Sequence, residues 1–265
     1  MCKTTNKKRP DYCQVVVFIV IPILAMVPYI AYPTIINVPG DYQTISEAVT
    51  YAEDWDTVLV APGTYNGLYY RGNNESPEYV TLMGSGWPNG TTIIYCPSAS
   101  EQNAFEIEYV NGWRITNFEI TNCGDALRHY GVTKFEIDHN YMHGMTYSYW
   151  ACGILGDSTY GMSIHHNLIE DCDYGGILFG WSGDVINGVH VYNNTIVHID
   201  SYDGIQFRNH TPINCVVTNN IIVDCGEEGI EFALCSQGNT DISYNCIYQV
   251  SSPWSNVPNP GPGNI

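Results

Sequence analysis

The sequence predicts an all-β solenoid, a parallel β-helix in which short strands stack coil upon coil, and three observations support this fold class. One strand pattern recurs about every 25 residues, which is typical of stacked repeats. Asparagine occupies one fixed position within that pattern. A single amphipathic helix pattern precedes the repeats, where a solenoid needs a cover for its first coil.

The amphipathic helix is expected in TISEAVTYA, between two short strand patterns within residues 35–65. Thr44 or Asp41 can cap it. Because a stack of coils leaves the end of its core and unpaired backbone groups exposed, we expect the helix to cover the first coil. Its apolar face consists of Ile45, Ala48, Val49 and Ala52.

The repeats are expected within residues 105–250, and each begins with an apolar residue on a short strand. Such strands are satisfied when each pairs with its copy in the next coil, about 4.8 Å away. Asparagine side chains at one corner would then stack and bond one another. A β-sandwich would instead require hairpin turns and strict alternation. The leading residues are Ile115, Ile137, Ile164, Val191, Val217 and Ile242, and the asparagines are Asn140, Asn167, Asn194, Asn220 and Asn245, with Phe118 at the first position.

A second strand follows in every repeat except the last, in ALRHY, GILGD, GILFG, GIQFR and GIEFA. After its small first residue, the first and third residues should point into the core and the second and fourth outward.

Residues 251–265, SSPWSNVPNPGPGNI, show no helix or strand pattern that could cover the last coil. We therefore expect a truncated chain or a partner that covers this edge.

Residues 1–32 differ from the rest of the chain. Four Lys and Arg precede an uncharged apolar run from Val15 to Tyr32, which is typical of membrane targeting. The run is short for a spanning helix and contains Pro22 and Pro28, so both a cleaved signal peptide and an uncleaved membrane anchor are open. We expect residues 33–265 to form one domain outside the membrane, secreted or anchored at the cell surface.

The expected domain is strongly acidic. Residues 33–265 contain five Lys and Arg against 26 Asp and Glu, a net charge of −21, compared with −18 for the whole chain. Such a surface repels nucleic acid, so no nucleic-acid partner is expected. It suits a calcium-containing exterior.

The cysteines predict a ladder of buried thiols. Cys123, Cys172 and Cys225 stand two coils apart, about 10 Å, which is too far for a disulfide. Cys215 and Cys235 flank one coil and could pair, which the sequence does not decide.

The stretch PGDYQTISEAV and the following DTVLVAPGTY resemble the N-terminal cap of right-handed parallel β-helix proteins of the pectin-lyase-like superfamily. With the repeats, the resemblance covers residues 35–250. It implies a right-handed coil and a polysaccharide partner. The activity stays open, because the superfamily includes lyases, hydrolases, esterases, epimerases and coils without a known reaction.

Complete active-site motifs of these families are missing from the sequence. The paired aspartates of pectin methylesterases and the Asp-Pro-His-Glu of alginate epimerases have no match. Of the polygalacturonase motifs, only a fragment occurs, in MHG with His143 and Gly144. These motifs therefore do not decide whether the protein is an enzyme.

Lyase chemistry requires a Lys or Arg base and usually a cation such as Ca²⁺ that neutralises the substrate acid. Arg128 and Arg208 lie on outward rows of the second strand, and Lys134 begins the next coil. These three residues and Asp157 are the candidate catalytic residues. The competing interpretation is that the cations only offset neighbouring acids.

A sugar-binding groove is expected over Gly180, which Asp157 and Arg208 flank at about 10 Å. Aromatic side chains would wall this groove, or would instead cover loose edges of the core. The expected substrate-binding residues are Tyr147, Tyr149, Trp150, Trp181, Gln206 and Glu231.

Carboxylates on adjacent coils, about 5 Å apart, would bind a hard cation or hold one carboxyl group with a raised pKa. The candidate calcium ligands are Asp200, Asp203, Glu227 and Glu228. The competing interpretation is a solvated acidic turn. We interpret the histidines as turn or stacking residues, because an HxxxH spacing on strands offers no metal geometry; these are His139, His143, His165 and His166.

These observations predict an exported β-helix protein that binds or processes an extracellular polysaccharide by lyase-like or hydrolase-like chemistry. The alternative is a noncatalytic surface module for adhesion or coat structure. The lack of any complete family motif favours that alternative.

Overall fold

The computed structural model describes residues 32–86, 90–97, 103–146, 150–182, 185–257 and 260–265. Residues 33–265 form one compact unit. The expected targeting segment lies outside the described residues, apart from Tyr32. In the part of the chain that the structure describes, no helix is both long enough and apolar enough to cross a membrane.

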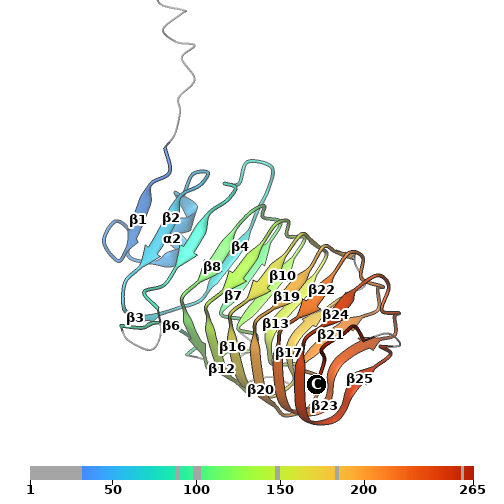
Figure 1. Ribbon diagram of the computed structural model, residues 1–265. Coiled ribbons are helices and arrows are strands. Elements are labelled where there is room, and N and C mark those ends of the chain that lie inside the picture. Colours follow the sequence, from blue (N-terminus) through green and yellow to red (C-terminus); the bar gives the residue numbers. More distant parts are fainter. Residues whose placement is uncertain (1–31, 87–89, 98–102, 147–149, 183–184, 258–259) are drawn as a thin grey trace, which may run out of the picture. The chain divides into compact units, whose positions relative to one another are not determined.

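The compact unit is the predicted parallel β-helix, and its coils stack along one axis (Figure 1). Each coil contributes strands to three faces, numbered here in the order in which the chain meets them. The first face is a nine-stranded parallel sheet. Its strands are β1 (Ile35–Val38), β2 (Thr57–Val60), β5 (Thr81–Met83), β8 (Arg114–Thr116), β11 (Glu136–Asp138), β15 (Ser163–His165), β19 (His190–Tyr192), β22 (Val216–Thr218) and β24 (Asp241–Ser243).

The second and third faces belong to one 14-stranded sheet, because β23 (Ile221–Ala233) runs through both and β25 (Cys246–Ser255) pairs along it. The second face contains β3 (Gly63–Tyr65), β6 (Thr92–Tyr95), β9 (Glu119–Thr121), β12 (Tyr141–Met145), β16 (Leu168–Cys172) and β20 (Thr195–Ile199). The third face contains β4 (Leu68–Arg71), β7 (Phe105–Glu108), β10 (Leu127–Tyr130), β13 (Cys152–Asp157), β17 (Gly175–Phe179) and β21 (Ile205–Arg208). A separate two-stranded sheet pairs β14 (Thr159–Tyr160) with β18 (Ile186–Asn187).

The predicted asparagine ladder is confirmed at the corner between the first and second faces. Each buried amide donates to the Oδ1 of the next asparagine over 3.0–3.2 Å, from Asn140 onward. The backbone N–H of each asparagine donates to that same oxygen. Phe118 holds the first position and donates its N–H to Asn140. Each later amide oxygen in the ladder, from Asn167 onward, therefore receives two hydrogen bonds from the preceding coil.

The inward positions of the third face also follow the prediction. The buried residues Leu127, Ile154, Ile177, Ile205 and Ile230 form one column. In the next column Phe179, Phe207 and Phe232 stack at 5.4 and 5.2 Å between ring centroids.

In the second column a histidine, His129, lies between Ile107 and Gly156. Burial of His129 lowers its pKa to about 3, so the imidazole is neutral in the core. Its partner in the next coil is Gly156, where a Cβ would lie 2.1 Å from His129 Nε2. The glycine therefore makes the room that the imidazole occupies.

The cysteine prediction is wrong at one position. Cys123 forms a disulfide with Cys96, whose Cα lies 5.1 Å away in the preceding coil. The sequence interpretation compared only equivalent positions in the repeats, and Cys96 precedes the first recognised repeat. Cys172 and Cys225 are buried free thiols separated by Ile199, as expected, and Cys215 and Cys235 are also free thiols.

The C-terminal segment also differs from the prediction. β25 extends to Ser255 and pairs Trp254 with Ile230, so the last repeat has a second strand. Beyond it, Ile265 exchanges backbone hydrogen bonds with Asn245 and Ile247. Asn264 adds a further amide to the ladder. Backbone pairing to the preceding coil holds this segment, although its sequence carries no periodic strand pattern.

Helix α2 (Ile45–Thr50) lies in the first coil, between β1 and β2, as predicted (Figure 1). Thr44 caps it and exchanges hydrogen bonds with Glu47 in a capping box. Ile45, Ala48 and Val49 are buried in the common core. The helix contacts β1, β2 and β4, so it covers the core at the N-terminal end of the solenoid.

Replacing Ile45 and Val49 together with Asp should expose this end of the core. Burial of two such side chains contributes roughly 3–6 kcal/mol, so the melting temperature should fall by at least about 6 °C, or the protein should aggregate. Differential scanning calorimetry measures the change. Ser46→Asp, on the exposed side of the same helix, is the control and should melt like the wild type. An unchanged melting curve for the double variant would contradict the packing described here.

Candidate functional site

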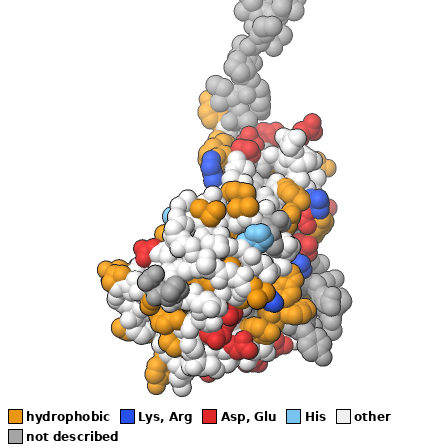
Figure 2. Space-filling model, turned by 90° about the vertical axis from the view of Figure 1, so that its right-hand side faces the viewer, with side chains coloured by type: hydrophobic (Ala, Val, Ile, Leu, Met, Phe, Trp, Pro, Cys, Tyr) orange, Lys and Arg blue, Asp and Glu red, His pale blue; other side chains and the backbone are white. Residues whose placement is uncertain are grey.

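A cavity of about 300 Å³ lies on the outer surface of the third face, over β10 and β13 and beside the loops that flank β17. Its lining combines one cation, one carboxyl group and several aromatic rings. The lining residues are Asn103, Gly124, Asp125, Arg128, Trp150, Cys152, Leu155, Tyr174 and Trp181. On the side of the molecule drawn in Figure 2, Lys and Arg are scattered singly among groups of Asp and Glu.

The cavity wall is a second apolar layer outside the coil. Leu155 and Leu178, which point outward as the alternation predicts, are buried with Cys152 and Tyr174. Trp181 and Tyr202 pack against this cluster. An outward-pointing side chain on these coils is therefore not necessarily exposed to solvent, because aromatic side chains from the loops cover the strands.

Three aromatic side chains lie together at the cavity. The Trp150 ring lies 4.6 Å from that of Trp181 and 4.8 Å from that of Tyr174, measured between centroids. Trp150 is 49% exposed, so one side of the cavity presents an open indole. Tyr147 and Tyr149, predicted to contribute to this wall, lie outside the described residues.

Asp125 is the carboxyl group of the cavity. It is 5% exposed, and its Oδ1 accepts a hydrogen bond from the Cys152 N–H at 3.1 Å. Burial raises the pKa of Asp125 to about 7, although the Cys152 N–H and the charge of Arg128 oppose this rise. Asn103 accepts the N–H of Asp125 and fixes its backbone. A carboxyl group with this pKa exchanges its proton near neutral pH.

Arg128 follows Asp125 on β10 and is exposed beside it. In the outer row of the third face it lies between Glu106 and Leu155. Of the four candidate catalytic residues, Arg128 is the one that lines the cavity. The sequence interpretation missed Asp125 as a catalytic candidate, although it precedes the second strand at the position that Asp203 holds three coils later.

The expected groove over Gly180 is wrong. Gly180 has φ +85°, and a Cβ there would lie 2.0 Å from the carbonyl oxygen of Arg208. The loop after it binds both flanking residues: the Ser182 N–H donates to Asp157 Oδ1 at 3.0 Å, and the Arg208 guanidinium lies 4.9 Å from the Trp181 ring centroid. Asp157 is buried, and burial raises its pKa. The loop fills the space that a sugar was expected to occupy.

Lys134 does not line the cavity, because a row of turn residues holds it. Its Nζ donates to the Tyr79 hydroxyl at 3.1 Å and lies 5.7 Å from the centre of that ring. The Tyr79 ring covers Gly112, where a Cβ would meet it at 2.2 Å, and stacks on Trp55 at 4.0 Å between centroids. This packing supports the competing interpretation, a structural role for Lys134.

A second polar group lies further along the third face. Carboxylate oxygens of Asp203, Glu228 and Glu231 lie within 4.8 Å of one another. The Gln206 amide donates to Asp203 and to Glu231, each at 2.7 Å, and the Glu228 N–H donates to Asp203 at 2.8 Å. Asp203 is fully buried, and burial with the nearby Glu231 raises its pKa to about 8. Gln206 Oε1 is buried and has no hydrogen-bond partner among the described residues.

The structure thus brings together two of the four candidate calcium ligands, Asp203 and Glu228. Asp200 and Glu227 are exposed and lie outside this group, which Glu231 completes. Glu231 joins the group because it stands beside Gln206 in the strand register, and the Gln206 amide donates to both Asp203 and Glu231.

The fold and these sites define a right-handed parallel β-helix protein with a polar, aromatic-walled cavity on one flank. Residues 87–255 match the family model described as a right handed beta helix region, so the chain belongs to that family. The right-handed parallel β-helix that the sequence resemblance implied is confirmed. No curated protein sequence matches the chain.

Two solved structures illustrate the likeness. An alginate lyase from Paenibacillus sp. str. FPU-7 has a TM-score of 0.65 and 13% sequence identity, over 82% of this chain and 77% of its own. XylC, solved in complex with xylose, has a TM-score of 0.51 and 15% identity, over 74% of this chain and 36% of its own. At these identities the likeness shows the fold alone.

Because burial raises the pKa of Asp125 above its value in the unfolded chain, the folded protein binds this proton more tightly. Its contribution to stability is present below about pH 4 and is lost as the pH rises through about 7. Asp125→Asn keeps the acceptor for the Cys152 N–H without the charge. The variant should melt with the wild type at pH 4 and roughly 3 °C or more above it at pH 8.

Thermal melts at both pH values test this expectation. The exposed Asp241→Asn is the control and should leave the pH dependence unchanged. Parallel melting curves for Asp125→Asn and the wild type would contradict the assigned pKa.

Proposed function

We propose that the protein is exported by its N-terminal segment, as a secreted or membrane-anchored protein, and that it binds and processes an extracellular polysaccharide containing uronate sugars in the third-face cavity. The single observation that carries this proposal is that Arg128 and Asp125, whose pKa is about 7, line the same aromatic-walled cavity. The similar solenoid of an alginate lyase is in keeping with this substrate class.

The three kinds of group have distinct roles in such a site. Aromatic faces at Trp150 and Trp181 stack on sugar rings. The Arg128 guanidinium pairs with a uronate carboxylate in a bidentate manner and withdraws charge from it. The unprotonated Asp125 removes the proton on the carbon next to that carboxylate.

These roles favour β-elimination over hydrolysis. Loss of the proton forms a carbon–carbon double bond, the glycosidic C–O bond breaks, and the leaving oxygen takes up a proton. Hydrolysis of a glycoside uses two carboxyl groups that flank the scissile bond. Among the described lining residues the cavity offers one, Asp125. The rival function, a noncatalytic glycan-binding module, would use the same aromatic wall.

The full-length protein should release unsaturated products, detected by their ultraviolet absorbance, from uronate polysaccharides and not from neutral glycans. Arg128→Gln should lower kcat/KM about 100-fold, since it removes the charge that stabilises the transition state. Asp125→Asn should abolish turnover and keep binding, measured by calorimetry. Arg71→Gln, which breaks an exposed pair with Glu108 on the same face, is the control and should have no effect.

The outcomes separate the two functions. Binding that depends on Arg128 without any product would favour the noncatalytic module. The proposal would be overturned if the protein neither bound nor cleaved any uronate polymer.

We also propose that the acidic group on the third face binds Ca²⁺ outside the cell. Oxygen ligands from Asp203, Glu228 and Glu231 suit this hard cation, and a rotated Gln206 amide would add its unpartnered oxygen. A bound ion would offset the repulsion among these carboxylates in a domain of net charge −21.

Millimolar Ca²⁺ should therefore raise the melting temperature by several °C, because it binds only the folded state; about 3 kcal/mol is expected at 100 times the Kd. The double variant Asp203→Asn with Glu228→Gln should lose this rise. Asp200→Asn with Glu227→Gln removes the same charge at exposed neighbouring positions and should keep it. An equal response in both double variants would show unspecific charge screening.

A further inference from the structure

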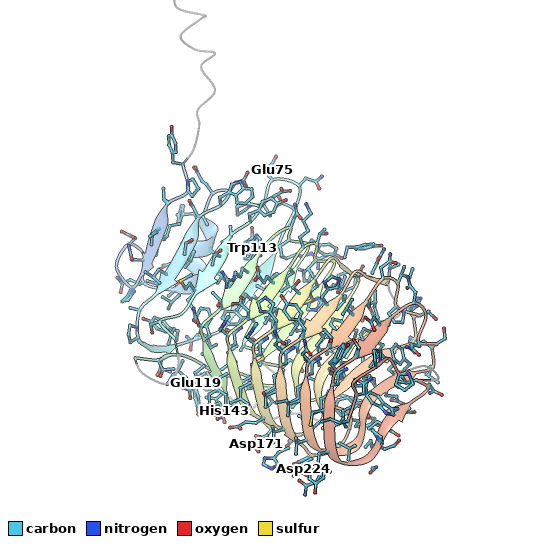
Figure 3. The ribbon with its side chains drawn as sticks, in the orientation of Figure 1. Glu75, Trp113, Glu119, His143, Asp171 and Asp224 are labelled. Atoms are coloured by element: carbon cyan, nitrogen blue, oxygen red, sulfur yellow. A yellow bond between two sulfur atoms is a disulfide. The ribbon has the colours of Figure 1, made fainter. Side chains whose placement is uncertain are left out.

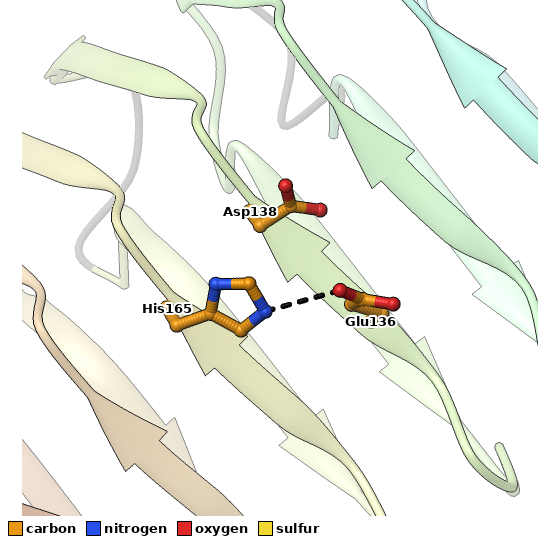
Figure 4. A group of neighbouring side chains, drawn as sticks. All are labelled: Glu136, Asp138 and His165. Carbon is orange, nitrogen blue, oxygen red and sulfur yellow. Dashed lines mark hydrogen bonds and ion pairs between the residues drawn. The ribbon is translucent and has the colours of Figure 1, made fainter.

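A group of imidazoles and carboxylates lies on the outer surface of the first face, away from the third-face cavity. Glu136 and Asp138 on β11 and His165 on β15 have side chains on the same side of the sheet (Figure 4). The strand register places Asp138 beside His165 and His165 beside Tyr192. Ligand atoms of Glu136, Asp138 and His165 lie within 4.8 Å of one another.

The ring nitrogens of two histidines in this group face each other. His165 Nδ1 lies 2.9 Å from His166 Nδ1. On the opposite side of its ring, His165 Nε2 lies 3.1 Å from Glu136 Oε1. Because a carboxylate can only accept, the Nε2 of His165 carries the hydrogen, and its Nδ1 presents a lone pair toward His166.

The surroundings hold both rings in place. The His165 ring stacks on Tyr192 at 4.7 Å between centroids, and the His166 ring stacks on His139 at 5.0 Å. His139 in turn contacts Asp138 at 2.6 Å. The rings are therefore positioned by neighbours from three successive coils.

The charge balance of the group favours a cation. Arg114 binds Asp138 with two hydrogen bonds of 2.6 and 2.7 Å, and it lies 3.7 Å from Glu136. Thr116 and His139 also bond to Asp138, so both oxygens of this carboxylate already have hydrogen-bond partners. Two carboxylates against one guanidinium leave a net negative charge beside the imidazoles.

We propose that a divalent late transition-metal ion, of the zinc class, binds between His165 Nδ1 and His166 Nδ1, with Glu136 as the carboxylate that orients His165. Imidazole nitrogens select Zn²⁺, Cu²⁺ or Ni²⁺ over Ca²⁺ and Mg²⁺, which prefer oxygen. A carboxylate on the far nitrogen of a metal-binding histidine is the usual arrangement.

The site requires both rings to move. Two Zn–N bonds of about 2.0–2.1 Å at a tetrahedral angle place the nitrogens about 3.3 Å apart, so the rings must separate by about 0.4 Å and turn until both Nδ1 lone pairs point at the ion. His166 is exposed, which leaves room for water as the remaining ligands. Without the ion, a hydrogen on one Nδ1 holds the same contact as an N–H···N hydrogen bond, and the ion takes the place of that hydrogen.

Calorimetric titration of the untagged full-length protein with Zn²⁺ tests the proposal. We expect the wild type to bind one Zn²⁺ ion per chain. His165→Gln and His166→Asn should each lower the affinity for this ion at least tenfold. Glu136→Gln should weaken binding about 10–100-fold, because it frees the His165 ring to turn. Asparagine is chosen at 166 because that residue has φ +55° and the next coils hold Asn193 and Asn219 there in the same conformation.

The matched control is His143, which Figure 3 labels together with Glu119. Its Nε2 lies 3.1 Å from Glu119, whereas its Nδ1 lies 3.5 Å from the Thr121 hydroxyl and not from a second imidazole. His143→Gln should therefore bind Zn²⁺ like the wild type. Binding at the thiols, such as the half-buried Cys235 and Cys246, should be equal in all variants.

Two results would overturn the proposal. One is a Zn²⁺ isotherm that is the same for the wild type and His166→Asn, with circular dichroism confirming that both are folded. The other is displacement of the ion by an equal concentration of Ca²⁺, which would indicate a site made by charge alone. Because the site and the cavity lie on different faces, uronate binding by the variants reports separately on the proposed function.

Discussion

Hydrogen bonding between consecutive coils is the interaction on which the structure depends. None of the three-residue strands of the first face could persist alone, and each is held by its copies in the adjacent coils, with β24 at the end of the sheet held by β22. The asparagine ladder fixes the register of this stacking at one corner. A buried amide there must find its partner in the next coil or remain unsatisfied, so a slip of one residue is costly.

The repeat made the fold predictable from sequence, because every coil places the same residue types at the same inward and corner positions. Features that depend on departures from the repeat were not predictable. Cys96 pairs with Cys123 from outside the recognised repeats, and Glu231 rather than Glu227 completes the acidic group, because Gln206 bonds both Asp203 and Glu231. The groove over Gly180 failed because the loop after it folds back, a contact that strand alternation does not encode.

The candidate sites show what a solenoid offers chemically. Residues about 25 positions apart become neighbours, so functional groups assemble along the axis rather than within one segment. The cavity draws Asp125, Cys152 and Trp181 from successive coils, and residues on β11 and β19 hold the histidine pair. Each face can therefore carry its own chemistry, with the common core as support.

The amide ladder divides the corners of the solenoid into one of constant length and two of variable length. From Ile115 to Ile120 and from Ile242 to Ile247, the paired positions across the asparagine corner are five residues apart, whereas Trp150 and Trp181 occupy longer connections at the other corners. Insertions or deletions at the other two corners therefore leave the asparagine ladder in register. The cavity wall can thus be lengthened, shortened or exchanged by loop grafting while the coils beneath it stay aligned.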